Sequence, residues 1–345
     1  MVMVGIEGTM FGDDAKQMIQ QHRVGGIILF KRNIDNPAQT LSLINELKRA
    51  NSANKIPLFL SVDEEGGRVS RMPDQLRDLP PSGRIGEIGD NELAFEIGRV
   101  LGQELKALGF NMNFAPVLDI NSNPNNPVIG DRAFGTTPDL VSRLGIQTMK
   151  GIQSQNVISV VKHFPGHGDT SVDSHIGLPS VYHDYERLKS FELIPFADAI
   201  KNKADAVMIA HILLPQIDPE HPASLSRAVI TDILRKDLNF QQVVITDDLT
   251  MGAIANNYNL GEAAVKAVTA GSDIVLVCHS LEMEMQVINA LTNAVETGQI
   301  STERIDESVY RILKLKQKYQ LTDEPVESID IDQINRDIEQ VLSWL

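Results

Sequence analysis

The hydrophobic residues of this chain form eight short runs that recur along most of its length. Within each run the apolar residues are nearly continuous instead of alternating with polar ones. This pattern is typical of parallel strands that are covered on both faces. The runs are MVMVGI from Met1, GGIILF from Gly25, PLFLSV from Pro57, FNMNFAPVLDI from Phe110, VISVVKHF from Val157, DAVMIAHILL from Asp205, QVVIT from Gln242 and DIVLVC from Asp273.

The segments between these runs have the periodicity of helices. In residues 90–109, Asp90 or Asn91 can cap the start of a helix, and Gly109 is well placed to end it. Its apolar residues recur at i, i+4 spacing on one face, at Leu93, Ile97, Leu101 and Leu105. Further helices are expected at residues 36–50, 138–155, 185–201, 227–238, 261–270, 282–297 and 301–320.

Strands that alternate with helices eight times predict a single (β/α)₈ barrel of the TIM type, with a doubly wound open sheet as the main alternative. We expect the barrel to occupy residues 1–320 and to carry a long catalytic loop after its fifth strand. Residues 321–345 are expected to form an acidic tail or a short helix packed on the barrel.

Composition narrows the possible partners and the compartment. A net charge of −15 argues against nucleic acid or an anionic membrane as a partner, because both require a basic surface. No apolar run is long enough to span a bilayer, so membrane insertion is not expected. The lone Cys278 excludes an internal disulfide framework and fits a reducing cytoplasm. A secreted or cell-surface chain whose leader has been removed is the alternative.

Polar side chains stand at the ends of five predicted strands. Because the carboxyl ends of all strands meet at one mouth of an α/β barrel, we expect these side chains to face a common site. They are Asp63, Lys162 with His163, His211, Asp247 and His279.

The stretch VKHFPGHGDTSVDSH, from Val161 to His175, concentrates three histidines and two aspartates. Three interpretations are open. Imidazoles and carboxylates at these spacings can bind a metal, but glycines flank His167 and no second ligand cluster accompanies the stretch. The stretch can also be an ordinary solvated loop. In the third, Asp173 orients the imidazole of His175 for proton transfer, because residues two apart on an extended segment lie on the same side.

A proton-transfer pair needs a nucleophile, and VVITDDLTM offers Asp247 and Asp248 directly after a buried strand. Successive side chains at a strand end point to opposite sides, so at most one of the two faces the barrel axis. A carboxylate nucleophile and a separate acid/base are the parts of a retaining glycosidase.

Four motifs together resemble the bacterial β-N-acetylglucosaminidases (β-hexosaminidases) of glycoside hydrolase family 3: VDEEGGRVSR, NNPVIGDRAFG, VKHFPGHGDTSVDSHIGLP and ITDDLTM. The resemblance covers nearly the whole chain. It implies Asp247 as the nucleophile and His175 as the acid/base, held by Asp173. The substrate-binding residues that it implies are Asp63, Arg71, Arg132, Lys162 and His163.

The resemblance further implies a hydrolase that releases N-acetylglucosamine from peptidoglycan fragments or chito-oligosaccharides, with no metal and no cofactor. Two alternatives lie within the same family, a glycoside phosphorylase and a β-glucosidase. An alternative of another class is a metal-dependent hydrolase that uses the His/Asp loop.

Overall fold

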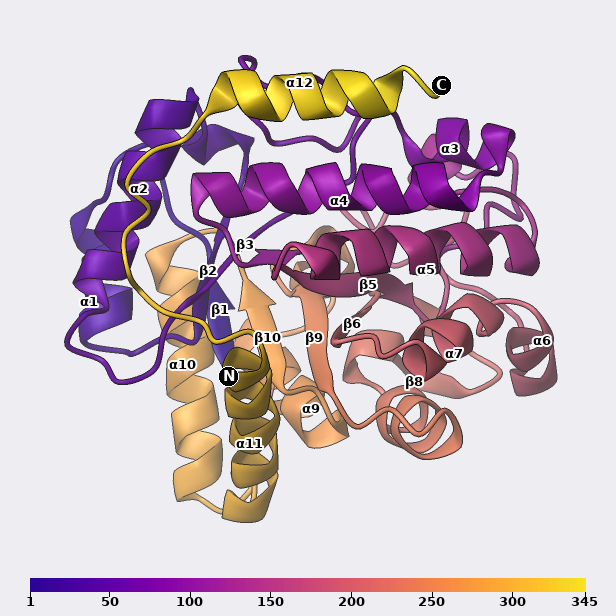
Figure 1. The fold of residues 1–345 in the computed structure, drawn as a ribbon. Coiled ribbons are helices and arrows are strands. Elements are labelled where there is room, and N and C mark those ends of the chain that lie inside the picture. The colour runs from indigo at the N-terminus through magenta and orange to yellow at the C-terminus, as the bar shows by residue number, and fades with distance from the viewer.

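The computed structural model describes residues 1–345, and its centre is a closed barrel of eight parallel strands (Figure 1). The strands follow one another around the barrel in chain order, with β10 closing onto β1. The predicted (β/α)₈ fold is therefore confirmed, and the doubly wound sheet is excluded. The barrel strands are β1 (Val2–Val4), β2 (Gly26–Leu29), β3 (Phe59–Val62), β4 (Met112–Asn113), β5 (Ile158–Phe164), β6 (Ala206–Ile209), β9 (Val243–Asp248) and β10 (Ile274–Val277).

Helices surround the barrel and connect its strands (Figure 1). The α-helices are α1 (Asp13–Gln20), α2 (Pro37–Ala50), α3 (Ser82–Ile88), α4 (Asn91–Leu108), α5 (Pro138–Ser154), α6 (Tyr185–Ser190), α7 (Ile194–Lys201), α8 (Gly252–Ala255), α9 (Leu260–Ala270), α10 (Leu281–Glu296), α11 (Thr302–Lys318) and α12 (Ile331–Leu342). Short 3₁₀ turns are η1 (Lys31–Asn33), η2 (Gly130–Arg132) and η3 (Ala223–Leu225), and η4 (Ala228–Asp237) is a π-helix. A small antiparallel sheet, β7 (Leu213–Leu214) with β8 (Asp218–Pro222), stands outside the barrel.

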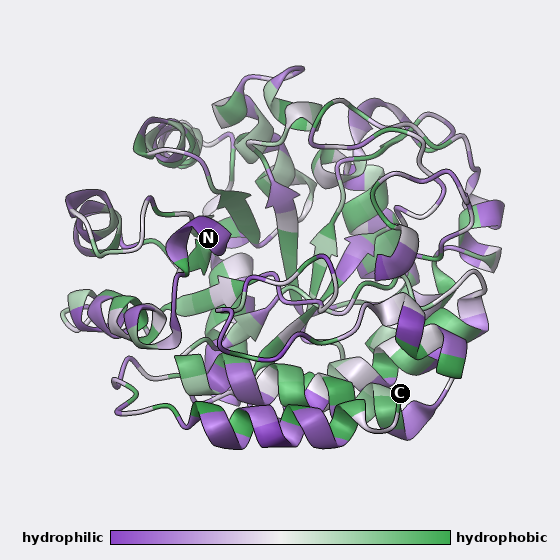
Figure 2. Cartoon of the chain, turned by 90° about the horizontal axis from the view of Figure 1, so that it is seen from above, coloured by the Kyte–Doolittle hydropathy of each residue, from purple (hydrophilic) through white to green (hydrophobic).

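The barrel interior is filled with side chains and is not a channel. Phe59, Met112, Phe114, Ile158 and Met208 are among the buried residues that pack inside it. Seen from above, the hydrophobic strands lie at the centre and the outer helices carry the hydrophilic residues (Figure 2). Any site must therefore form above this packed interior, at the carboxyl ends of the strands.

Three elements differ from the sequence-based expectation. The fourth strand is only two residues long, and its ladder with β5 is interrupted before Pro116, which has no N–H to donate, and resumes as a single bridge between Val117 and Lys162. The helix expected at residues 185–201 is broken between α6 and α7, where Pro195 begins a new first turn. The helix expected at residues 227–238 is a π-helix. Asp90 caps α4 as expected, because its carboxylate accepts from the backbone N–H groups of Glu92 and Leu93.

The last residues of the chain lie across the outside of the barrel helices. From the end of α11 the chain passes α2, where the side chain of Asn45 both donates to and accepts from the backbone of Val326. Helix α12 then runs alongside α4 (Figure 1) and buries Ile334, Ile338 and Val341. The division into a barrel of residues 1–320 and a separate tail stays a prediction.

A long loop follows the fifth strand, and we refer to residues 165–184 as the β5–α6 loop. Asn126 holds its first part by donating to the carbonyl oxygens of His167 at 2.8 Å and Gly168 at 3.1 Å. Its last part is held by β7, because Val181 donates to the carbonyl of Leu213 at 2.9 Å. The loop is thus fixed at both ends and passes over the mouth of the barrel between them.

None of the helices in the structure combines the length and the apolar character that crossing a bilayer requires.

Candidate active site

A pocket lies at the carboxyl ends of the barrel strands and encloses about 830 Å³ of empty space up to its open mouth. Seven of the eight residues implied by the resemblance line it: Asp63, Arg71, Arg132, Lys162, His163, His175 and Asp247. Asp173 stands behind His175 and does not line the pocket. The structure thus collects in one place residues that come from the ends of β3, β5 and β9 and from the three connections that follow β3, β4 and β5.

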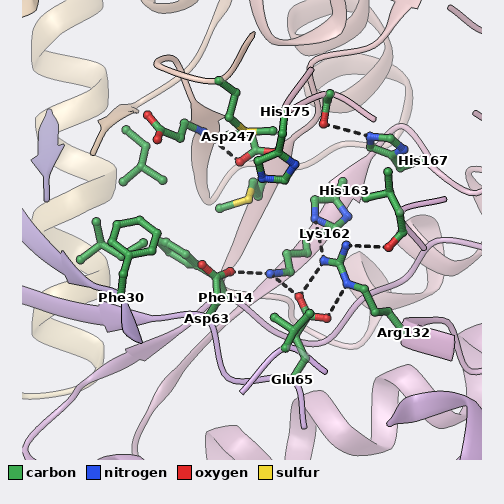
Figure 3. Close-up of a pocket in the computed structure, with 18 of the residues that line it drawn as sticks. Phe30, Asp63, Glu65, Phe114, Arg132, Lys162, His163, His167, His175 and Asp247 are labelled. Carbon is green, nitrogen blue, oxygen red and sulfur yellow. Dashed lines mark hydrogen bonds and ion pairs between the residues drawn. The ribbon is translucent and has the colours of Figure 1, made fainter. Parts of the chain in front are cut away.

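One wall of the pocket is a chain of alternating charges (Figure 3). Lys162 donates to Asp63 at 2.6 Å and pairs with Glu65 at 2.7 Å. The guanidinium of Arg132 meets both oxygens of Glu65 at 2.8 Å. Burial would raise the pKa of Glu65, but Lys162 and Arg132 outweigh it and hold that pKa far below its ordinary value. The network therefore stays charged and rigid, and its outward atoms are ready to hydrogen-bond a polar ligand.

Arg71 is the cation of this wall that forms no ion pair. Its guanidinium has one long hydrogen bond, of 3.5 Å, to the carbonyl of Ser70, whereas its backbone N–H donates to Glu64 at 2.7 Å. Glu64 also accepts from Gly66 at 3.2 Å, so this buried carboxyl fixes the turn that carries Glu65 and Arg71. In the sequence, Glu64 is only one letter of the VDEEGGRVSR motif, and this bracing role was not predicted.

The pKa of Glu64 makes stability depend on pH near neutrality. Burial raises this pKa from 4.5 to about 7, and the buried Glu104 of α4 lies close enough for the two charges to interact. The folded chain therefore keeps a proton that the unfolded chain releases at lower pH. The free energy of unfolding that Glu64 contributes is complete below pH 4.5 and is lost as pH rises through about 7.

We predict that Glu64→Gln flattens this loss of stability. Urea denaturation of the wild type and the variant over this pH range measures the difference directly. Glu92→Gln, a change at an exposed position on the same helix as Glu104, is the control and should leave the slope unchanged. An identical pH slope in Glu64→Gln and the wild type would contradict the assignment.

The adjacent carboxylates Asp247 and Asp248 have different surroundings. Asp248 is fully engaged, accepting from the N–H and hydroxyl groups of Thr250 at 2.9 and 2.6 Å and from the N–H of Cys278 at 3.2 Å. Both carboxylates line the pocket, but Asp247 accepts a single hydrogen bond, from the N–H of Asp248 at 2.8 Å. Burial opposes its charge, but His211, His163 and Lys162 nearby hold the pKa of Asp247 below its ordinary value. Asp247 is therefore the carboxylate available to a ligand.

Asp173 and His175 form the pair that their spacing predicted. The carboxylate of Asp173 accepts from the backbone N–H of His175 at 2.9 Å and contacts its Nδ1 at 2.8 Å. Burial would raise the pKa of Asp173, but these hydrogen bonds keep it below its ordinary value. A carboxylate at Nδ1 fixes the proton there and leaves Nε2 of His175 free to take up or release a proton.

The other histidines of the barrel mouth each have a separate partner. His163 contacts the fully buried Asp119 through Nδ1 at 2.6 Å, and His167 contacts the hydroxyl of Thr170 at 2.7 Å. Burial lowers the pKa of His167 to about 4, so it stays neutral. His163, His167 and His175 therefore do not converge, and no three His, Cys, Asp or Glu side chains are arranged around a common metal position.

The two remaining strand-end histidines, His211 and His279, lie in different surroundings. His211 is buried beneath the pocket, where it contacts the hydroxyl of Ser224 at 2.7 Å and the carbonyl of Asp248 at 2.9 Å. His279 lies at the rim, and its hydrogen bond to Asp248 raises its pKa. Of the strand-end set, His211 is thus the residue that the structure excludes from the pocket.

The sequence analysis did not predict roles for Glu65 and Asp119. Glu65 lies two residues beyond Asp63 in the VDEEGG motif, and its place after a buried strand was the available signal. Asp119 lies inside an apolar run and accepts the backbone N–H of His167 at 2.6 Å as well as contacting His163. A single carboxylate in a buried run is costly without partners, which is a weak sign of a structural or functional role.

Comparison with known proteins identifies the family. Residues 1–315 match the profile described as "Glycosyl hydrolase family 3 N terminal domain". A barrel with this pocket and this match defines the class: the chain belongs to glycosyl hydrolase family 3.

The individual relatives refine this result. The chain is 37% identical over 334 residues to beta-hexosaminidase A of Pseudoalteromonas piscicida, covering 90% of this chain and 56% of that protein. It is 36% identical to the beta-hexosaminidase of Nitrosomonas eutropha, covering 91% of each. The family 3 beta-N-acetylglucosaminidase from Paenibacillus sp. FPU-7 superimposes with a TM-score of 0.93 at 46% identity, covering 99% of this chain and 66% of that one. The chain therefore spans only part of two of these three relatives.

Proposed function

We propose that this chain is a retaining exo-β-N-acetylglucosaminidase that works through a covalent glycosyl–Asp247 intermediate. The observation that carries the proposal is the pairing of two features in one pocket. Asp247 is a free, low-pKa carboxylate at the end of β9, and an Asp173–His175 pair stands at the mouth with Nε2 free. The names of the relatives support the choice of an N-acetylhexosaminide as the substrate.

In the first step, a carboxylate oxygen of Asp247 attacks the anomeric carbon while the bond from that carbon to the glycosidic oxygen breaks. Protonated His175 donates its Nε2 proton to the departing oxygen, and Asp173 stabilises the imidazolium. In the second step, neutral His175 takes a proton from water as the water oxygen attacks the anomeric carbon and Asp247 is released. Two displacements restore the original anomeric configuration.

The charged wall opposite Asp247 is proposed to hold the sugar. Asp63 can accept from a pair of hydroxyls, while Lys162, Arg132 and His163 donate to hydroxyl and acetamide oxygens. Arg71 can add a further donor because it has no carboxylate partner. Since Asp63 and Glu65 together balance the charges of Lys162 and Arg132, the wall can grip a neutral sugar without carrying a large positive charge.

The natural substrate and the compartment of the enzyme can also be proposed. We propose that the chain removes N-acetylglucosamine from peptidoglycan fragments, in the cytoplasm, as part of cell-wall recycling. The family membership and the names of the relatives support the sugar. The single buried Cys278 fits that compartment.

The central test compares an aryl N-acetyl-β-glucosaminide with the matching β-glucoside, each with and without phosphate. We expect faster cleavage of the N-acetylated substrate, β-N-acetylglucosamine as the first product by NMR, and no effect of phosphate or of a chelator. Formation of a sugar 1-phosphate would identify a phosphorylase instead. A preference for the glucoside, or loss of activity with the chelator and recovery with zinc, would overturn the proposal.

A further inference from the structure

The β5–α6 loop carries His175 on its tip, residues 171–178, and this tip rests on the first turn of α8. The N–H of Ala253 donates to the carbonyl of Ser174 at 2.9 Å. Helix α8, which receives the tip, begins at Gly252, four residues after β9 ends at Asp248 and five residues after Asp247. The contact therefore links the two halves of the proposed chemistry.

Gly252 makes this contact possible. A Cβ at Gly252 would lie 2.5 Å from the carbonyl oxygen of His175 and 3.1 Å from that of Ile176. Real Cβ atoms do not approach a backbone oxygen to 2.5 Å, and neither backbone can move away without shifting the loop. Any side chain at this position would push the His175 backbone off α8.

Little else holds the tip in place. Its other hydrogen bonds to the rest of the chain are long, 3.4 Å from His167 to Ser174 and 3.5 Å from Asn256 to Ile176. Its apolar side chains add little burial, because Val172 is 41% exposed and Ile176 is 76% exposed. A single backbone hydrogen bond contributes little net free energy, so a small clash suffices to change the position of the tip.

We propose that Gly252 is a positioning residue for the reaction: the absence of a side chain lets the loop tip sit on α8, and this seat holds the His175 imidazole where it reaches the glycosidic oxygen. The inference rests on the proposed role of His175. In this proposal Gly252 does not contact the sugar and is not needed for α8 to fold. Alanine is in fact the better helix former at this position.

The test is Gly252→Ala in the full chain, measured on N-acetyl-β-glucosaminides with leaving groups of graded acidity. We expect kcat/KM to fall about 100-fold for poor leaving groups and to stay within about threefold for dinitrophenyl, because only poor leaving groups need the proton. Gly177→Ala is the matched control: it adds a Cβ to the same tip, where the nearest atom is Val172 Cγ1 at 3.7 Å. It should behave like the wild type.

A double variant separates positioning from general damage. In a His175→Ala background, Gly252→Ala should cost almost nothing further, because the group that it positions is already gone. Ala253→Pro is a second, independent variant: it removes the N–H donated to Ser174, and in the first turn of α8 that N–H has no partner within the helix to lose. It should reproduce the leaving-group dependence even if Gly252→Ala folds poorly.

Two outcomes would overturn the inference: equal losses on all leaving groups in Gly252→Ala, or full additivity with His175→Ala. The failure of the proposed function looks different. If the proposed function is wrong, the loss in His175→Ala will not depend on the leaving group. If only the inference about Gly252 is wrong, the loss in His175→Ala will depend on the leaving group, and the loss in Gly252→Ala will not.

Discussion

Replacing Asp247 with asparagine is expected to reduce turnover of every N-acetyl-β-glucosaminide by roughly 10⁴–10⁶-fold, the scale on which loss of an enzymatic nucleophile acts. The amide keeps the shape of the side chain and can still accept from the N–H of Asp248. It carries no charge, however, and cannot form the glycosyl ester. Steady-state rates with a nitrophenyl substrate measure the loss, and circular dichroism checks that the variant is folded.

The neighbouring Asp248→Asn is the matched control. Asp248 accepts hydrogen bonds from Thr250 and Cys278, so its replacement should lower thermal stability while substantial turnover remains. A fluorinated glycoside that traps the covalent intermediate adds a direct readout, because the labelled peptide should carry the sugar on Asp247. Label on Asp248, or normal turnover by Asp247→Asn, would show that the nucleophile is assigned to the wrong residue.

The second large effect is expected for His175→Ala, and it should depend on the substrate. For poor leaving groups such as a second sugar, kcat/KM should fall about 10²–10⁴-fold, the usual contribution of a general acid. For dinitrophenyl it should change little, since that group departs without a proton. The value of kcat should fall for both substrates, because the same imidazole is the base in the second step.

Asp173→Asn is the companion variant for this experiment. An amide in place of the carboxylate still contacts Nδ1 of His175 but no longer favours the imidazolium, so the effect should have the same pattern and a smaller size. Equal losses on good and poor leaving groups in His175→Ala would argue against the acid role. So would an Asp173→Asn variant with wild-type rates on both.

The fold was predictable from the sequence because its signal is local and repeated. Each strand is a continuous apolar run and each long helix has its own period, so the order of elements follows without knowledge of distant contacts. The errors fall where a local pattern is overridden. The ladder of β4 is interrupted before Pro116 inside an apolar run, and residues 185–201 divide into α6 and α7 just before Pro195.

The site was predictable only in part. The pair Asp173 and His175 could be proposed from spacing alone, since both belong to one short segment. The sequence could not show which of Asp247 and Asp248 is available to a ligand. That choice depends on Thr250 and Cys278, which donate hydrogen bonds to the carboxylate of Asp248. Glu65, Asp119 and Gly252 escaped prediction for the same reason. Each matters through a contact with a residue far away in the chain, and no periodicity records such contacts.

Sugar binding and bond cleavage are assigned to different segments of the chain. The side chains proposed to hold the sugar lie between Asp63 and His163, on β5 and in the segments that follow β3 and β4, whereas those proposed to break and remake its bond lie between Asp173 and Asp247. Because Lys162 and His163 also lower the pKa of Asp247, selection for a different sugar without loss of reactivity is expected to act on residues 63–132. A library restricted to codons 63–132 should change which glycoside is accepted more readily than how fast an accepted one is cleaved.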